Sequence, residues 1–311
     1  MTTALSTLAG RVRDRLGGEP VPLPGGHSGL TYSVTSSTGR YVVKAVPPGR
    51  RPIGRDDVLR QARVLTALRG ENVPVPEVVA VDKRKPAWFA MEFATGDAVE
   101  PVTDEHDLDP ATARARMLAL VAVLRRLHEV DLSGLPTDLP APTDARAELD
   151  RWSRTLHAVP AELRPGSDEL LRRLAATVPG DLPPVLLHGD FRLGNALCVG
   201  DRVTAVIDWE IWSVGDPRTD LAWLLLFRDD TNFPGVGRPV EDLPTEAELL
   251  AGYGPALPDM DWFRALGRMK MAAIMGHNLR RHREGRHHDP HQELLPPTIA
   301  AMIRTATEIL G

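Results

Sequence analysis

A chain of 311 residues is long enough to bury a substantial core, and we expect it to form two lobes. The hydrophobic share of 42% and the charged share of 25% exclude a wholly disordered chain, and the single cysteine, Cys198, excludes both an intramolecular disulfide and a cysteine-based metal cage. Residues 1–90 contain 14 Lys and Arg against 7 Asp and Glu, whereas residues 91–311 contain 23 against 35. The basic first part suits a polyphosphate and the acidic remainder disfavours a nucleic-acid partner, although lobes that differ in charge for solubility alone would show the same asymmetry.

The chain begins with a segment, residues 1–18, that is typical of a surface helix and lacks the apolar stretch of a secretory signal. The longest strongly apolar run, residues 221–227, covers about a third of the roughly 20 residues that a membrane span needs. We therefore expect a soluble cytoplasmic protein without a membrane partner. The sequence does not predict the oligomeric state.

Residues 20–95 predict a five-stranded sheet with one helix. Two alternating stretches around a Gly-containing turn, within residues 23–49, are typical of a hairpin. Apolar residues at helical spacing follow at 55–69. Two further strands are expected within 73–82 and 87–96, on either side of a charged turn.

From residue 104 onward the pattern is mostly helical, over 111–130, 144–178 and 245–310, and the Pro-rich stretch 135–144 is typical of a surface connection. Strands that precede helices in this way predict an α+β architecture. We expect a small antiparallel β lobe over residues 1–93 and a larger, mostly helical lobe over residues 94–311.

The stretch LLHGDFRLGNALCVGDRVTAVIDWE, residues 186–210, predicts a short hairpin whose open end carries polar side chains. Antiparallel pairing around Asp201 places Asn195 opposite Asp208, about 5 Å apart, and Asp190 can curl back to the same end. An Asp and an Asn that converge from two strands suit Mg²⁺ bridged to phosphates, and the second carboxylate is then free to accept a proton. Phosphoryl transfer to a hydroxyl needs both metal ligands and a separate proton acceptor. Each residue alone would more simply satisfy loop amides, but the joint spacing favours function.

The motifs HGDFRLGN and VIDWEIWSVGDPRTDLAW resemble the aminoglycoside phosphotransferase family, and the resemblance runs from about residue 20 to 285. It implies the two-lobed protein-kinase-like fold. It also implies a phosphotransferase that uses Mg²⁺ and ATP or GTP to phosphorylate a hydroxyl of a small molecule. The family's acceptors include aminoglycosides, neutral sugars, amino alcohols, macrolides and hydroxyacyl thioesters, so the acceptor stays open.

The resemblance implies that Asp190 is the catalytic base and that Asn195 and Asp208 are the Mg²⁺ ligands. Asp220, in GDPRTDLAW, matches the acid that holds the backbone of the catalytic loop.

His188 is expected to pack the catalytic loop and not to act as an acid or base. Arg192 follows the presumed base by two residues and could touch the transferred phosphoryl group, but an exposed loop arginine fits the sequence equally well. Glu210 would point to the same side as Asp208 if the extended geometry persists.

On the nucleotide side, GGHSGLTY at 25–32 resembles the family's phosphate-binding opening, although a tight hairpin turn uses similar residues. The candidates there are Gly25, Gly26, Ser28 and Gly29. AMEFATG at 90–96 resembles the hinge whose backbone bonds the adenine edge, with the candidates Met91, Glu92 and Phe93.

Lys44 lies between apolar neighbours on a strand and needs an anionic partner, for which nucleotide phosphates are the candidate. The alternative is an edge-strand lysine that faces water. Where the kinase-like fold has a glutamate to pair with this lysine, this chain has Gln61, and Asp57 is a possible substitute. The missing charge leaves open a second function, a catalytically weak or inactive nucleotide-binding or interaction module.

Overall fold

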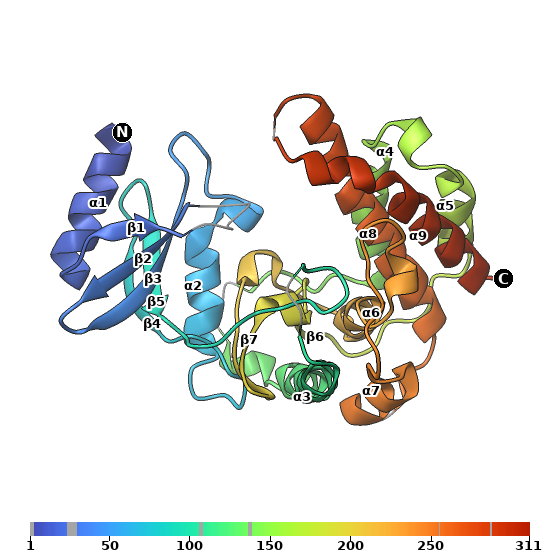
Figure 1. The fold of residues 1–311 in the computed structure, drawn as a ribbon, viewed down its shortest axis with the longest axis horizontal. Helices are drawn as coiled ribbons and strands as arrows, with labels where there is room; N and C mark the ends of the chain where they lie inside the picture. The colour runs from blue at the N-terminus through green and yellow to red at the C-terminus, as the bar shows by residue number, and fades with distance from the viewer. Residues whose placement is uncertain (1–2, 24–29, 106–107, 136–138, 255, 287) are drawn as a thin grey trace.

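The computed structural model describes residues 3–23, 30–105, 108–135, 139–254, 256–286 and 288–311. A small lobe built on one sheet and a larger, mostly helical lobe lie side by side (Figure 1). The predicted α+β, two-lobed architecture is therefore confirmed.

The sheet of the small lobe has five strands in the order β1-β2-β3-β5-β4, and each neighbouring pair is antiparallel, as predicted. The strands are β1 (Pro20–Pro22), β2 (Leu30–Ser36), β3 (Gly39–Ala45), β4 (Val78–Asp82) and β5 (Trp88–Glu92). Because β3 lies between β2 and β5, Lys44 belongs to a central strand. The alternative of an edge-strand lysine is wrong.

Helices cover both faces of this sheet. Trp88 of β5 packs in a cluster with α1 (Thr3–Leu16), whereas its neighbour Phe89 packs in a cluster with α2 (Val58–Ala67). Successive side chains of a strand point to opposite faces, so both faces are apolar and both need a cover. The helix expected within residues 20–95 is α2, and the surface helix expected over residues 1–18 is α1, whose Val12 is fully buried against the sheet.

The connection between the lobes runs from β5 to α3 (Pro110–His128). Within it, Asp97 pairs with Cys198 as an isolated antiparallel bridge, and the Arg116 guanidinium bonds both Asp97 carboxylate oxygens at 2.5 and 3.1 Å. One hydrophobic cluster extends from α2 through α3, so the lobes share packing. The domain boundary at 93/94 falls at the start of this connection and stays a prediction.

The larger lobe holds α3 and six further helices among the described residues: α4 (Ala145–His157), α5 (Ser167–Ala176), α6 (Arg218–Leu226), α7 (Glu246–Tyr253), α8 (Met260–Arg283) and α9 (Pro296–Ile309). In Figure 1, α4, α5, α8 and α9 form the end of the molecule far from the sheet. The α6 helix packs against α8 and is apolar on nearly all sides, which fits its position between the lobe's two hydrophobic clusters. In the parts of the chain that the structure describes, no helix is both long and apolar enough to cross a membrane.

Two short strand pairs lie between the sheet and these helices. The predicted hairpin is β7 (Ala196–Val199) with β8 (Arg202–Val206), and β6 (Val185–Leu187) pairs with β9 (Ser213–Gly215). The register of the hairpin shifts at an irregularity between Leu197 and Cys198. Beyond it, the Ile207 amide bonds the Asn195 carbonyl at 2.9 Å, so Asn195 lies opposite Ile207 and the predicted pairing with Asp208 is wrong by one residue.

Candidate active site

The loop that follows β6 is held by the first turn of α6. The Asp220 carboxylate is fully buried and accepts hydrogen bonds from the backbone amides of His188 at 2.6 Å and Gly189 at 2.9 Å. Burial acts to raise the pKa of Asp220, but nearby His128 and His188, with the backbone donors, lower it below its usual range. Asp220 is therefore an ionised anchor of this loop, the arrangement that the resemblance implies for it.

His188 is fully buried and links the loop to the hairpin. Its Nδ1 accepts a hydrogen bond from the Asp190 amide at 3.2 Å, so its Nε2 carries the proton and donates to the Ile207 carbonyl at 2.9 Å. Its ring meets Trp209 edge-on, with centroids 4.7 Å apart. Both ring nitrogens therefore contact backbone groups, one in the loop and one at the end of the hairpin.

The Asp190 side chain is partly exposed, and each carboxylate oxygen is held by a different donor. Oδ1 accepts from the Trp223 indole at 2.7 Å and Oδ2 accepts from the Asn195 amide nitrogen at 2.7 Å. Two fixed donors set the plane of the carboxylate while lone pairs remain for a ligand. The geometry suits a group that accepts a proton from a bound hydroxyl.

The open end of the hairpin has oxygen atoms suited to a hard cation. The Asn195 amide nitrogen donates hydrogen bonds to Asp190, so Oδ1 is the Asn195 side-chain atom available to bind a metal. Asp208 follows β8 with a φ of 66° and begins the short helix η5 (Trp209–Ile211). The described residues include no group of three or more His, Cys, Asp or Glu side chains that could hold a metal. An amide oxygen and one carboxylate, completed by phosphates and water, still match what Mg²⁺ accepts.

Lys44 reaches across from β3 to this end of the hairpin. Its Nζ donates to Asp208 Oδ1 at 2.7 Å and to Gln61 Oε1 at 3.3 Å. Burial acts to raise the pKa of Asp208, but the charge and hydrogen bond of Lys44 outweigh it and lower that pKa. Asp57 caps the N-terminus of α2 instead, so the suggestion that it substitutes as the lysine's partner is wrong.

Arg192 and a residue that the sequence analysis missed, Glu100, lie beside the loop. The Arg192 guanidinium is 3.3 Å from Asp190 Oδ1 and 3.5 Å from Glu100 Oε2, which also accepts from the Gly194 amide at 3.0 Å. Glu100 is fully buried, and that burial raises the pKa of its carboxyl to about 7 despite the arginine. Arg192 is thus a paired, partly buried arginine next to the candidate base, and not a simple exposed loop residue.

The remaining candidates are less closely tied to this site. Gly25, Gly26, Ser28 and Gly29 lie outside the described residues. Met91 is buried, and the amides of Glu92 and Phe93 donate to the carbonyls of Glu77 and Arg40, at 2.9 and 3.0 Å. A hinge at these positions would therefore have to use carbonyls, or amides further along. For Glu210, the extended geometry does not persist, because the chain turns into η5 at Asp208.

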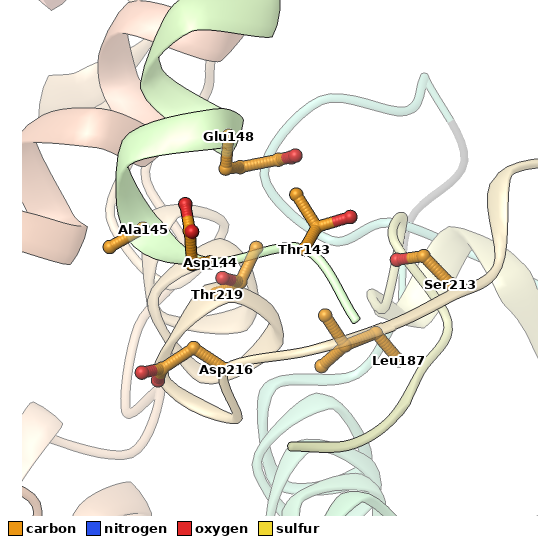
Figure 2. Close-up of a pocket in the computed structure, with 8 residues that line it drawn as sticks. All are labelled: Thr143, Asp144, Ala145, Glu148, Leu187, Ser213, Asp216 and Thr219. Atoms are coloured by element: carbon orange, nitrogen blue, oxygen red, sulfur yellow. The ribbon is translucent and has the colours of Figure 1, made fainter. Parts of the chain in front are cut away.

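Two adjoining pockets lie on the helical side of the loop. Figure 2 shows the first, with Asp144 and Glu148 from the start of α4 across from Leu187 and Ser213. The second shares Glu148 and is walled by side chains that include Trp152, Trp223 and Lys270. Because Trp223 also bonds Asp190, this second pocket adjoins the candidate base.

The family model of the phosphotransferase enzyme family (APH) matches residues 19–266, and the chain belongs to this family. Curated relatives include mouse acyl-CoA dehydrogenase family member 10, 26% identical over 271 residues. Another is the probable acyl-CoA dehydrogenase IBR3 of Arabidopsis thaliana, 30% identical over 221 residues. These matches cover 80% and 64% of this chain but only 25% and 26% of the relatives, so the chain spans about a quarter of their length.

Solved structures share the fold. A putative aminoglycoside phosphotransferase from Ralstonia eutropha superposes with a TM-score of 0.80 at 21% identity, over 98% of both chains. A spectinomycin phosphotransferase in complex with ADP and spectinomycin gives 0.68 at 15% identity, also over 98% of both chains. Choline kinase LicA from Streptococcus pneumoniae gives 0.62 at 17% identity, over 99% of both.

Proposed function

We propose that this member of the phosphotransferase enzyme family transfers the γ-phosphoryl group of ATP or GTP, with Mg²⁺, to a hydroxyl of a small molecule. The observation that carries the proposal is the arrangement at the open end of the hairpin. There, an oriented Asp190 carboxylate bonds Asn195, and Asp208 bonds Lys44. A carboxylate that can accept a proton, oxygens that can bind Mg²⁺ and a cation that can bind phosphate are what phosphoryl transfer to a hydroxyl would need, and this supports the proposal.

Each residue has a distinct part in this reaction. The acceptor oxygen forms the new bond to the γ-phosphorus as the bond to the leaving diphosphate breaks, and its proton passes to Asp190. Asn195 Oδ1 and the Asp208 carboxylate would hold Mg²⁺, which neutralises charge on the phosphate oxygens when bound. Lys44 would exchange Asp208 for a nucleotide phosphate, and Arg192 is near enough to Asp190 to meet the transferred group.

Several acceptor classes are worth testing. The solved relatives include a spectinomycin phosphotransferase and a choline kinase, and the curated relatives bear the name acyl-CoA dehydrogenase family member. An acceptor panel should therefore contain aminoglycosides, choline, neutral sugars, macrolides and hydroxyacyl thioesters. Release of nucleoside diphosphate that depends on one acceptor identifies the class.

A first experiment measures the thermal shift caused by ATP or GTP with and without Mg²⁺. Nucleotide alone would take Lys44 from Asp208 and leave a partly exposed carboxylate without its counter-charge, so we expect greater stabilisation when metal is also present. Asp208→Ala should abolish the metal-dependent part. Asp201→Ala, at the exposed turn of the same hairpin, is the matched control and should retain it. Equal shifts with and without metal would contradict the proposal.

A second experiment tests the base. Asp190→Asn keeps the shape of the side chain and its contact with Trp223 but cannot take up the proton, so nucleotide binding should persist while turnover falls by at least about a hundredfold. Near-normal turnover in this variant would remove Asp190 from the mechanism.

The alternative function is a catalytically weak or inactive module that binds nucleotide. One observation favours it: Lys44 is paired with the neutral amide of Gln61, which is buried, where the kinase-like fold has a glutamate. Metal-dependent nucleotide binding without diphosphate release for any acceptor in the panel would support this alternative.

A further inference from the structure

The α6 helix places two side chains on the catalytic loop. Asp220 and Trp223 are three residues apart, so they lie on one face of the helix. Asp220 bonds the loop's backbone amides, and the Trp223 indole donates to Asp190 Oδ1 at 2.7 Å. Trp223 is itself buried, so the donor is fixed by the surrounding core.

Lys270 comes to the same place from α8. Its ammonium donates to the Gly189 carbonyl and lies 4.0 Å from the centre of the Trp223 ring and 5.3 Å from that of Trp152. The side chain is 4% exposed, and burial lowers the pKa of its amine. A buried ammonium has a large desolvation cost that a carbonyl and two ring faces offset only in part. The proposed phosphoryl-transfer step does not itself use the buried Lys270 ammonium.

Both backbone polar groups of Gly189, the residue before Asp190, are hydrogen-bonded. The Gly189 amide donates to Asp220 and its carbonyl accepts from Lys270. Gly189 has a φ of 87°, and a Cβ there would lie 2.7 Å from the Ile211 carbonyl oxygen. The backbone direction into Asp190 is therefore fixed by α6 on one side and α8 on the other.

We propose that Trp223 and Lys270 are positioning residues that fix the carboxylate of Asp190 toward the acceptor hydroxyl. Trp223 holds Oδ1 directly, and Lys270 holds both the preceding carbonyl and the face of the Trp223 ring. The inference rests on the proposed role of Asp190 as the base. It extends the site to Trp223, the last residue of the motif GDPRTDLAW, to which no role was assigned, and to Lys270 of α8, which lies outside the motifs.

The kinetic test compares two Trp→Phe variants. Trp223→Phe keeps an aromatic ring and removes the N–H bond to Asp190, so kcat should fall about ten- to one-hundredfold, the range for losing one hydrogen bond to a charged group. The KM for nucleotide and for acceptor should change less than about threefold. Trp262→Phe is the matched control, because its indole is equally buried and donates to the Leu174 carbonyl at 3.0 Å, away from the loop. It should lower stability without lowering kcat.

Lys270 is tested by a pair of variants. Lys270→Met keeps the long apolar stem between the tryptophan rings but removes the bond to Gly189, and kcat should fall as in Trp223→Phe. Lys270→Arg retains a donor and should restore part of the loss. Both variants should keep the thermal shift caused by nucleotide with Mg²⁺. Full activity in Trp223→Phe and in Lys270→Met, with a wild-type enzyme that turns over, would overturn the proposal.

A measurement without turnover separates this proposal from the proposed function. The chain has six tryptophans, so the indole N–H resonance missing from the NMR spectrum of Trp223→Phe identifies Trp223. That resonance should move in Asp190→Asn and in Lys270→Met, and the Trp262 resonance should not. If the Trp223 resonance moves but no acceptor is phosphorylated, the proposed function is wrong and the Trp223–Asp190 hydrogen bond is supported. An unmoved resonance rejects the positioning contact, whatever the activity.

Discussion

The buried carboxyl of Glu100 makes stability depend on pH in a direction opposite to that of a salt-bridged acid. In the folded chain its pKa is raised from an ordinary value of 4.5 to about 7, first because of burial. The folded state therefore binds this proton more tightly than the unfolded state. The stabilising effect is complete below about pH 4.5 and is lost as the pH rises to about 7. At about 1.4 kcal/mol per unit, the loss amounts to about 3 kcal/mol.

The glutamine of Glu100→Gln resembles the protonated side chain at every pH, so this variant should lack the Glu100 contribution to the pH dependence of the unfolding free energy. Urea unfolding followed by circular dichroism, at about pH 5 and about pH 8, gives the change in unfolding free energy for wild type and variant. The wild-type chain should lose about 3 kcal/mol more than Glu100→Gln between these conditions. Glu105→Gln, exposed in the same connection, is the control and should follow the wild type. Parallel curves for wild type and Glu100→Gln would refute the assigned pKa.

Two further predictions concern the backbone and the helix cap. Gly189→Ala should destabilise the chain by about 1–3 kcal/mol more than Gly200→Ala: both glycines have positive φ, but only at Gly189 would a Cβ meet a backbone oxygen. Thermal unfolding measures the difference, and equal losses would contradict it. Asp57→Ala should cost about 1 kcal/mol, as the loss of a helix N-cap does, with the nucleotide-dependent thermal shift unchanged. Loss of the nucleotide-dependent thermal shift in Asp57→Ala would indicate that Asp57 does act as a partner of Lys44.

The sequence predicted the elements of the site better than their register. Alternation and a Gly-Asp turn were enough to place the hairpin, and the loop spacing brought Asp190 and Asn195 together. The hairpin turns at Gly200 and Asp201 with Val199 opposite Arg202, and the irregularity between Leu197 and Cys198 then shifts the ladder by one residue, so Asn195 lies opposite Ile207 and not Asp208. Nothing in strands of four and five residues distinguishes a regular ladder from a shifted one. The positive φ of Asp208, which turns the chain into η5, had no signal either.

The sequence analysis did not identify the residues that contact the catalytic loop from distant parts of the chain. Glu100, Trp223 and Lys270 contact the loop from a connection and two helices, and helical periodicity predicts which face is buried but not what it touches. Lys270 lies within the segment 245–310 that was expected to be helical, among residues that α8 buries. A lysine between apolar residues was the available hint of a special environment.

The pairing of Lys44 shows how one substitution changes the balance of the site. Where a glutamate would hold the lysine permanently, Gln61 supplies only a 3.3 Å amide contact, and the strong partner becomes Asp208 at 2.7 Å. The lysine's counterion is then also a proposed metal ligand, so we expect nucleotide and Mg²⁺ to bind together, because either one alone would leave the partly exposed Asp208 or Lys44 without its counter-charge. On this reasoning Gln61 does not by itself abolish catalysis. We expect it instead to make nucleotide binding depend more steeply on Mg²⁺.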